Sequence, residues 1–394
     1  MEKREPMVYL CRVPAYDQAA CDAAAERIFA AMPAAARIGA DTHILLKPNL
    51  LSRHEPDAAV TTHPAVLRAV IRACKARGAR PENIVMADSA GGVYNPGQTK
   101  ALYRVSGLAA VCEEEGITAY TGCESVQRPV PDGRVVHQFE LLRPVAEADL
   151  IIDLPKFKTH VMTGMTGACK NLFGVIPGLQ KAEWHMRFPD KGRFGDMLID
   201  LLETVQPAFA VVDAVVGMDG DGPAGGRPHP VGLLLGGEDL PSLDLAAAAL
   251  MGLDPMAVPY LEAAHRRGLC TARFDAADLA GDTDAFAPVP GWKLPVSYAF
   301  GAGADTDFAS GKRVPRFLAP LARRAEHAVA PHPVIDRSRC IGCGKCAEIC
   351  PQHTIALENG KARIHPQNCI RCFCCHEMCP AKAIEVRQFR LFRL

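Results

Sequence analysis

Hydrophobic and polar positions alternate along the first two thirds of the chain in a way that predicts strands and helices in turn. Short apolar runs of strand length cover residues 8–13, 43–47, 83–87, 150–154, 209–212 and 231–235. The apolar spacing of an amphipathic helix covers residues 17–32 and 64–77, with Pro64 suited to a first helical turn. This alternation predicts an α/β domain with a mostly parallel sheet and flanking helices.

A change of pattern near the C-terminus predicts further parts of the chain. After residue 281 the sequence is rich in Pro, Gly and Ala, its periodicity is weak, and it carries basic residues between 312 and 324. We expect an α/β domain over 1–281, a connector with one short basic helix over 282–333, and a small α+β domain over 334–394. The basic helix could dock on a membrane or a partner, but a solvated surface helix is the simpler interpretation.

Composition and charge argue against several classes of protein. The chain has 394 residues, 49% of them hydrophobic, which is enough to build more than one core. Its formal net charge is zero, so no overall field favours nucleic acid as a partner. No secretory signal follows Met1, and no apolar run approaches the length of a membrane span. We therefore expect a soluble, cytoplasmic protein.

The sixteen cysteines are distributed unevenly. Seven lie singly along the chain, and the other nine fall between Cys340 and Cys379. A disulfide scaffold is small, secreted and has cysteines throughout, whereas dense local clustering in a long chain is typical of metal binding. The pattern predicts a metal-binding C-terminal segment in a reducing compartment.

This cysteine-rich segment contains one motif twice. Residues 340–351 read Cys-x₂-Cys-x₂-Cys-x₃-Cys-Pro, and residues 369–380 repeat that spacing. An apolar segment follows each motif at the same offset, at 354–357 and 383–386. The motif is the run that ligates cubane clusters in two-cluster bacterial ferredoxins. The sequence therefore predicts a bacterial ferredoxin-type domain that holds two 4Fe–4S clusters and passes single electrons.

In such a pair of motifs, each cluster takes three ligands from one motif and the fourth from the other. The predicted ligands of cluster one are Cys340, Cys343, Cys346 and Cys379. The predicted ligands of cluster two are Cys369, Cys372, Cys375 and Cys350. Zinc would also accept Cys-x₂-Cys pairs, but two complete runs with both prolines favour cubanes. Cys374 fits no ligand position, so it is either a spectator or a substitute for Cys375.

A basic segment follows the strand predicted at 150–154. Ligands of parallel α/β sheets bind at the carboxyl ends of strands, so lysines, an imidazole and an amide at that position predict an anion or phosphate site. The candidate residues are Lys156, Lys158, His160, Lys170 and Asn171. For any single lysine, a solvated basic loop is the alternative.

Two carboxylates follow other predicted strands. Asp88 ends the strand at 83–87, and Asp213 ends the strand at 209–212 before a glycine-rich turn over 217–223. Both could face the basic segment, and with His160 they could hold a metal, although such residues are often caps or turn residues. The chain has no phosphate loop, no Gly-x-Ser-x-Gly elbow and no dinucleotide fingerprint after its first strand. A second cofactor in the large domain therefore stays unknown.

The ordered series of motifs in the large domain resembles the domain-of-unknown-function 362 (DUF362) family. The motifs are Lys47-Pro-Asn49, Asp88-Ser89, Leu154-Pro-Lys-Phe-Lys-Thr-His160, Thr166-Gly167, Lys170-Asn171-Leu-Phe-Gly174, Asp213, and Gly217-Met218 with Gly222-Pro223. The resemblance covers about residues 8–268. Because that family is often joined to a C-terminal pair of 4Fe–4S motifs, it implies an iron–sulfur protein, but it implies no particular reaction.

Three functions fit these observations. The first is an iron–sulfur oxidoreductase whose large domain binds a small anionic substrate or a second cofactor. The second is a non-catalytic electron carrier or assembly factor, with the large domain as a docking platform for a redox partner protein. The third is a non-redox enzyme with structural or redox-sensing clusters. We favour the first, because a carrier has no need of a convergent site at strand ends.

Overall fold

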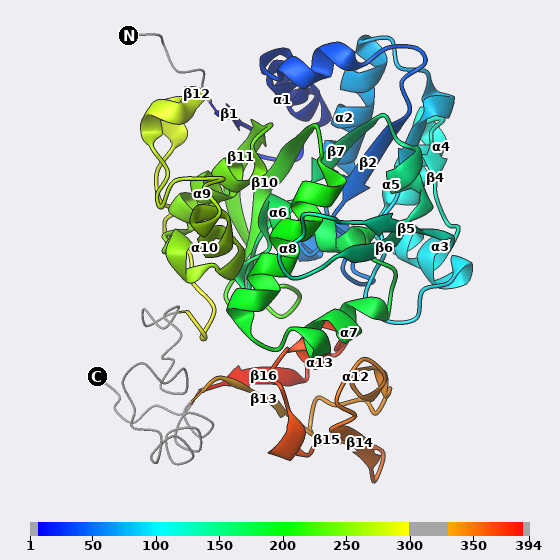
Figure 1. Ribbon diagram of the computed structural model, residues 1–394, viewed down its shortest axis with the longest axis vertical. Helices are drawn as coiled ribbons and strands as arrows, with labels where there is room; N and C mark the ends of the chain where they lie inside the picture. The colour runs from blue at the N-terminus through cyan, green and yellow to red at the C-terminus, as the bar shows by residue number, and fades with distance from the viewer. Residues whose placement is uncertain (1–6, 299–329, 389–394) are drawn as a thin grey trace.

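The computed structural model describes residues 7–298 and 330–388. Within these ranges, the chain forms a large α/β domain with a small ferredoxin-type domain packed against one end of it (Figure 1). The basic helix predicted between 312 and 324 lies outside the described residues. In the two described ranges, no helix is long and apolar enough to cross a membrane.

A ten-stranded sheet forms the centre of the described part of the large domain. Its main path has the order β12-β1-β11-β10-β7-β2-β3-β4, and β8 and β9 extend from β10. The strands are β1 (Val8–Arg12), β2 (Ile44–Pro48), β3 (Ile84–Met86), β4 (Thr118–Ala119), β7 (Leu150–Leu154), β8 (Lys156–His160), β9 (Gly164–Met165), β10 (Phe209–Asp219), β11 (Arg227–Gly237) and β12 (Leu279–Gly281). From β4 to β10 the pairs are parallel, whereas β11 is antiparallel to both its neighbours. The predicted mostly parallel sheet is confirmed.

Helices cover both faces of this sheet (Figure 1). One face packs against α1 (Gln18–Ala31), α2 (Pro64–Ala76), α3 (Pro96–Val105) and α4 (Leu108–Glu115). The other face packs against α6 (Gly167–Asn171), α8 (Lys191–Val205), α9 (Leu240–Met251) and α10 (Pro259–Arg266). A hairpin of β5 (Ser125–Pro129) and β6 (Gln138–Leu142) leads into α5 (Arg143–Glu147). Helix α7 (Gln180–Arg187) lies where the large domain meets the small one.

Successive residues of the central strands point into two different cores, as the two-residue period of a strand requires. Ile152 and Val211 pack in the core beneath α1 and α2, while their neighbours Ile151 and Val212 pack in the core beneath α8 and α9. Because both faces are buried, these strands appear in the sequence as continuous apolar runs, which is why they could be predicted.

Strand β10 is longer than predicted. It continues past Asp213 to Asp219 through a register shift between Ala214 and Val216. A bulge of this kind bends a strand without ending it, and the apolar run that stops at Val212 does not reveal it. The predicted strand end and the predicted turn over 217–219 are therefore wrong, and Asp213 lies inside the strand.

The basic segment at 156–160 forms strand β8 rather than a loop. It pairs in parallel with β10 and antiparallel with β9. All five of its residues are buried. Since a buried charged or polar side chain is costly without a partner, each lysine of this strand needs a specific environment.

The connector begins later than predicted. Residues 282–298 still belong to the large domain, because the backbone N–H of Asp282 donates to Leu10 O at 2.9 Å and Tyr298 Oη donates to Met162 O at 2.9 Å. The predicted boundary after residue 281 is wrong. Individual hydrogen bonds hold this segment in place, and they leave no periodic pattern in the sequence.

The ferredoxin-type domain consists of two similar halves. Its elements are β13 (His332–Ile335), α12 (Lys345–Glu348), β14 (Ile355–Glu358), β15 (Lys361–Ile364), α13 (Cys374–Glu377) and β16 (Ile384–Arg387). Gly342 and Arg371 occupy equivalent positions and have φ of 70° and 55°, and the equivalent His353 and Lys382 have φ of 50° and 47°. Non-glycine residues rarely adopt positive φ. The two motifs therefore share a backbone conformation as well as a cysteine spacing.

Candidate functional site at the domain interface

A cavity of about 80 Å³ lies where the ferredoxin-type domain meets the carboxyl ends of β2, β3 and β8. One ordered water needs about 10–15 Å³ of such space, so the cavity has room for several waters or a small organic ligand. Its lining is strongly cationic on the side of the large domain. The lysines that line it are Lys47, Lys158, Lys170 and Lys181.

Five of the seven candidate residues that the sequence predicts in the large domain line this cavity. They are Asp88, Lys158, His160, Lys170 and Asn171. The other two, Lys156 and Asp213, do not line it. Two residues along a strand advance by about 7 Å, so Lys156 lies well before Lys158 on the way to the carboxyl end of β8.

Lys156 and Asp213 form a separate buried network with Tyr16. Lys156 Nζ lies 2.8 Å from Asp213 Oδ2, and Tyr16 Oη donates to Asp213 Oδ1 at 2.8 Å. Burial lowers the pKa of Lys156, and Asp213 opposes that shift. The network joins the start of α1 to β8 and β10. Asp213 is therefore apart from Asp88 and His160, and these three residues do not fit a common metal.

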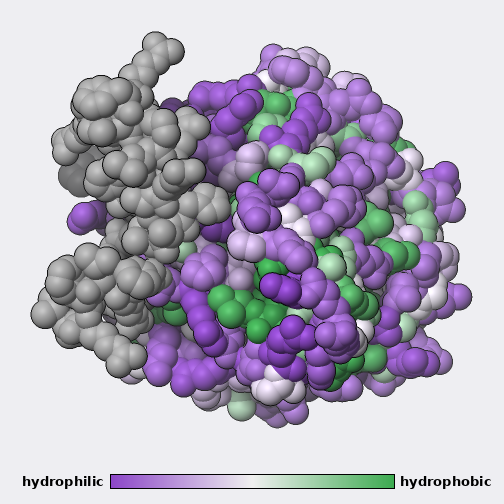
Figure 2. All heavy atoms as spheres, turned by 90° about the horizontal axis from the view of Figure 1, so that it is seen from below, coloured by the Kyte–Doolittle hydropathy of each residue, from purple (hydrophilic) through white to green (hydrophobic). Residues whose placement is uncertain are grey.

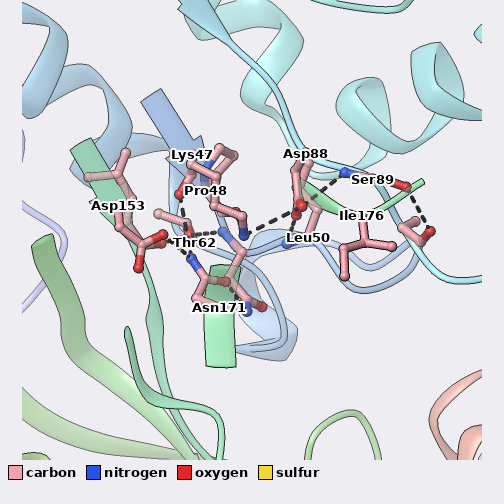
Figure 3. Close-up of polar contacts among 12 residues, drawn as sticks. Lys47, Pro48, Leu50, Thr62, Asp88, Ser89, Asp153, Asn171 and Ile176 are labelled. Carbon is pink, nitrogen blue, oxygen red and sulfur yellow. Dashed lines mark hydrogen bonds and ion pairs between the residues drawn. The ribbon is translucent and has the colours of Figure 1, made fainter. Parts of the chain in front are cut away.

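Lys47 holds Asp88 at the cavity wall (Figure 3). Lys47 Nζ lies 3.4 Å from Asp88 Oδ1, and the backbone N–H of Leu50 donates to Asp88 Oδ2 at 2.9 Å. Burial raises the pKa of Asp88, and Lys47 opposes that shift. A Cβ at Gly174 would lie 2.0 Å from Asp88 Oδ1, so the approach of the backbone to this ion pair requires a glycine.

A chain of side-chain amides connects Lys158 to Asp153. Lys158 Nζ donates to Asn49 Oδ1 at 2.7 Å, and Asn49 Nδ2 donates to Asn171 Oδ1 at 2.6 Å. Asn171 Nδ2 then donates to Asp153 Oδ1 at 2.7 Å (Figure 3). Burial raises the pKa of Asp153 to about 8, which favours the neutral carboxyl. Burial also lowers the pKa of Lys158 well below its usual range.

His160 presents an N–H group to the cavity. The backbone N–H of Met162 donates to His160 Nδ1 at 3.1 Å, so in the neutral ring the proton is on Nε2. Burial, and after it the charge of Lys170, lowers the pKa of His160 to about 4, so the ring is neutral at pH 7. Nε2 lies 3.1 Å from Glu377 Oε1 without the alignment of a hydrogen bond.

Several buried polar atoms around the cavity have no hydrogen-bond partner within residues 7–298 and 330–388. They are His160 Nε2, Thr166 Oγ1, His185 Nδ1 and Glu377 Oε1. In these same ranges the ammonium of Lys170 has no acceptor, and it lies 5.4 Å from the centroid of the Phe173 ring. Folded proteins pair nearly all buried polar groups, so unpaired donors and an unpaired carboxylate oxygen around one cavity indicate a ligand site.

Asp244 fixes the start of helix α6, which carries Lys170. The backbone N–H groups of Ala168 and Cys169 donate to its carboxylate at 2.6 and 2.9 Å. Burial raises the pKa of Asp244 to about 7. Asp244 thereby positions helix α6 without lining the cavity itself, and no sequence motif indicated this role.

The opposite wall of the cavity comes from the ferredoxin-type domain. Helix α13 contributes Cys374 and Glu377, and Met378 follows directly. Burial alone would raise the pKa of Glu377, but His160 and Lys170 hold it at about 2. Glu377 is therefore a largely buried carboxylate that lies across the cavity lining from His160 and Lys170 of the other domain.

His376 anchors α13 to the large domain. Its Nδ1 lies 2.6 Å from Ile384 O in the ferredoxin-type domain, and its Nε2 lies 3.0 Å from Asp221 O in the large domain. Ala182 of α7, Ile349 and Cys374 also pack together at this interface. The cavity is thus enclosed by a packed contact between two domains.

The predicted cluster ligands line two further spaces of about 20 Å³ each. Cys340, Cys343, Cys346 and Cys379 line the first space. Cys350, Cys369, Cys372 and Cys375 line the second space. The backbone N–H groups of Thr354 and Ala383 lie 3.4 and 3.2 Å from the sulfurs of Cys350 and Cys379, at equivalent positions of the two halves. Each space has the four thiols that a 4Fe–4S cluster needs, so the residues fit two clusters.

Sequence reasoning missed the contribution of the ferredoxin-type domain to the cavity. Glu377 has the same place in the second motif that the exposed Glu348 has in the first, so nothing in the sequence distinguished it. Cys374 did carry a signal, because it is an extra thiol where the first motif has Lys345. Cys374 lines the cavity and the second cysteine-lined space at once.

Residues 44–249 match the family described as "Domain of unknown function (DUF362)". The chain belongs to the DUF362 family. The resemblance inferred from its motifs is confirmed. Residues 332–380 match the 4Fe-4S dicluster domain. The C-terminal domain of this DUF362 protein is therefore an iron–sulfur electron-transfer module.

Two named proteins and one solved structure illustrate these similarities. Thylakoid-associated protein sll1697 from Synechocystis sp. is 32% identical over 230 residues, which are 57% of this chain and 68% of that protein. Ferredoxin-2 from Desulfomicrobium norvegicum is 48% identical over 29 residues, which are 7% of this chain and 49% of that protein. The lactate racemase apoprotein from Thermoanaerobacterium thermosaccharolyticum superimposes with a TM-score of 0.39 at 13% identity, over 64% of this chain and 58% of that one. The chain thus spans about half of the ferredoxin and less than two thirds of the racemase.

Proposed function

We propose that this DUF362 protein is an iron–sulfur oxidoreductase that exchanges single electrons with a small anionic ligand in the cavity between its domains. The observation that carries the proposal is the position of Cys374. Its buried side chain lines both the cavity and the space enclosed by Cys350, Cys369, Cys372 and Cys375. One side chain therefore separates a ligand in the cavity from that space.

The predicted ligand sets are the ones we propose for two 4Fe–4S clusters. Each cluster, when bound, gives or takes one electron at a time. The four thiols around the first space and the five around the second support the assignment, as do the N–H groups directed at the sulfurs of Cys350 and Cys379. Both Cys374 and Cys375 line the second space, and we keep Cys375 as the ligand because it has the position in the second motif that Cys346 has in the first.

The residues of the large domain support an anion as the ligand. The unpaired ammonium of Lys170 attracts negative charge, and the hydroxyl of Thr166 and the Nε2–H of His160 can donate hydrogen bonds to the same ligand. Lys158 adds a second amine, which Asn49 holds in place and whose protonated form a bound anion favours. Lys170 can also supply a proton to a ligand atom that gains negative charge, while the neutral ring of His160 donates a hydrogen bond to it.

Anaerobic reoxidation tests this function. The chain is purified with its clusters, reduced with dithionite and mixed with a panel of oxidised anions that includes 2-oxo acids, enoates and phosphorylated carbonyl compounds. We expect at least one of them to reoxidise the clusters, as followed by visible absorbance, and Lys170→Met to slow that reaction at least tenfold at equal iron content. Equal rates in the two proteins would contradict the proposal.

A different observation favours the alternative of an electron carrier. Ile341 and Leu357 are 66% and 50% exposed, and Leu357 lies beside Gly344, which lines the first cysteine space. In Figure 2, a view from the ferredoxin end, hydrophobic residues gather in patches among hydrophilic ones. We propose that a redox partner protein docks near Ile341 and Leu357. A pure carrier would keep its rate of exchange with that partner, and would reoxidise with no anion of the panel.

A cytoplasmic location is proposed from the cysteines. None of the sixteen forms a disulfide, and buried ones such as Cys11 and Cys74 lie outside both proposed ligand sets. A chain with this many free thiols is typical of a reducing compartment.

A further inference from the structure

Lysines and carboxylates in the cavity are unequal in number. Four lysines line it, and they face only two carboxylates, Asp88 and Glu377. The two imidazoles do not change this count, because burial lowers the pKa of His160 to about 4 and that of His185 to about 3. Buried charges without counter-charges are unfavourable, so the site has a net requirement for negative charge.

The hydrogen-bond partners of each lysine show which of the four lack a carboxylate partner. Lys47 pairs with Asp88. Lys158 donates to an amide oxygen and a backbone carbonyl, and Lys181 donates to backbone carbonyls at 2.6 and 2.7 Å. Such neutral acceptors satisfy hydrogen bonds but carry no charge. Lys170 lines the same cavity as Glu377, and its ammonium has no acceptor in the described residues.

Glu377 already brings one carboxylate of the chain itself into this site. Its Oε1 lies 3.1 Å from His160 Nε2 and has no aligned donor in the described residues, and its side chain is 12% exposed. The equivalent Glu348 of the first half is exposed. The carboxylate of Glu377 therefore neutralises part of the positive charge that a ligand anion would otherwise neutralise.

We propose that the cavity binds a dianion, such as a phosphoryl group or a dicarboxylate, and that Glu377 limits its affinity as a built-in competing anion. This inference rests on the ligand site of the proposed function and not on electron transfer. With Lys47 matched by Asp88, Glu377 is the one carboxylate among the lining residues that is left for Lys158, Lys170 and Lys181. Burial lowers the pKa of Lys158 and of Lys181, and a dianion beside these lysines would favour their protonated forms, so its two negative charges would match the two positive charges that Glu377 leaves over.

Isothermal titration calorimetry on the chain with its clusters tests the charge requirement. Sulfate and methanesulfonate serve as probes, since they have similar shapes but carry two charges and one. We expect sulfate to bind at least ten times more tightly than methanesulfonate. Succinate and inorganic phosphate, titrated in parallel, separate a dicarboxylate site from a phosphoryl site, and tight binding of either supports the inference. Equal affinity for sulfate and methanesulfonate overturns it.

Two pairs of variants test the residues. Glu377→Gln should raise the affinity for sulfate at least fivefold, whereas Glu348→Gln, at the matched position of the first half, should leave it within twofold. Lys170→Met should lower that affinity at least tenfold, whereas Lys293→Met, an exposed lysine outside the cavity, should not. A gain of affinity cannot come from misfolding, so an unchanged or weaker Glu377→Gln variant would overturn the role of Glu377.

The outcomes separate this inference from the proposed function. If sulfate binds with the expected preference but no anion reoxidises the clusters, the dianion site stands and the oxidoreductase is refuted. If an anion reoxidises the clusters but sulfate and methanesulfonate bind equally, the oxidoreductase stands and the dianion site is refuted.

Discussion

Glu377 Oε1 and His160 Nε2 lie 3.1 Å apart, although the two residues belong to different domains. The side chain of His160 is buried and that of Glu377 is 12% exposed, and the tautomer of His160 places a proton on Nε2, which has no aligned acceptor in the described residues. The ferredoxin-type domain thus supplies one wall of a cavity whose cations come from the large domain. The site is complete when the two domains are docked, which links ligand binding to the position of α13.

The ligand assignment of the clusters predicts a pattern of iron loss. Wild-type chain should contain about eight irons, and Cys343→Ala or Cys350→Ala should lose about four of them because each removes one ligand of one cluster. Cys350→Ala should abolish the same electron paramagnetic resonance signal as Cys372→Ala, although the two cysteines belong to different motifs. Cys374→Ala should keep all the iron. If Cys374→Ala lost iron and Cys375→Ala kept it, Cys374 would be the cluster ligand in place of Cys375.

The network around Asp213 predicts a loss of stability without a loss of ligand binding. Lys156→Met leaves Asp213 buried without its cation, and breaking a buried ion pair in this way costs about 3–5 kcal/mol of unfolding free energy. Chemical unfolding followed by circular dichroism measures the change. Adding Asp213→Asn should recover part of it, because the uncompensated charge is then gone.

The affinity for sulfate decides whether Lys156 has a second role. Lys156 does not line the cavity, so the folded Lys156→Met variant should bind sulfate as tightly as wild type. If the folded Lys156→Met variant bound sulfate ten times more weakly than wild type, Lys156 would belong to the ligand site, as the sequence predicted.

The ferredoxin-type domain and the sheet could be predicted because their constraints are local. The cysteine motif depends on spacing within a dozen residues, and the strands at 150–154 and 209–212 are apolar throughout because both faces of the sheet are covered. Asp213 shows the limit of this reasoning. The apolar run ends before it, but hydrogen bonds continue β10 through a bulge to Asp219.

The cavity could be predicted only on one side. Lys158, His160 and Asp88 meet because parallel strands bring their carboxyl ends to one edge of the sheet. Glu377 and Cys374 could not be assigned, because their place depends on which face of the ferredoxin-type domain docks on the large domain. That choice is made by packing and by contacts such as His376 to Asp221 O, between segments far apart in the sequence.

Gly174 predicts a strict size limit next to the Lys47–Asp88 pair. A Cβ at this position would lie 2.0 Å from Asp88 Oδ1 and 2.6 Å from Lys47 Nζ, so Gly174→Ala must displace the ion pair. Overpacking of this kind costs about 1–3 kcal/mol of unfolding free energy, and sulfate binding should weaken as Lys47 moves. Gly192→Ala in helix α8 is the control. Its new Cβ makes only an ordinary contact at 3.4 Å, so stability should stay equal or rise by about 0.5–1 kcal/mol.

The lowered pKa of Lys181 predicts that anion affinity decreases above pH 7. Burial lowers this pKa to about 7, Asp88 opposes the shift, and Lys47 and Lys170 add to it. Below pH 7 the ammonium is charged and matches an anion, whereas above pH 7 the folded chain has lost that proton and binding must recover it. Sulfate itself stays a dianion throughout this range.

Calorimetry between pH 6 and 9 measures this dependence. We expect the affinity for sulfate to decrease between pH 7 and 9. At pH 8, Lys181 should take up as much as one proton from the buffer when sulfate binds. Proton uptake appears as a difference in heat between buffers that have different ionisation enthalpies. Equal heats in two such buffers at pH 8 would show that Lys181 does not take part in binding.

An anion in the cavity should affect one cluster and leave the other unchanged. Cys374 separates the cavity from the second cysteine space, whereas the first space shares no lining residue with the cavity. Negative charge next to a cluster opposes the arrival of an electron, so saturating sulfate should lower the reduction potential of the cluster assigned to Cys350, Cys369, Cys372 and Cys375. A redox titration followed by electron paramagnetic resonance resolves the two clusters, with methanesulfonate as the singly charged control. Because Lys170→Met removes the anion and keeps all cluster ligands, it should abolish the shift. An equal shift of both potentials, or a shift that persists in Lys170→Met, would mean that sulfate acts elsewhere and that the cavity is not coupled to the second cluster.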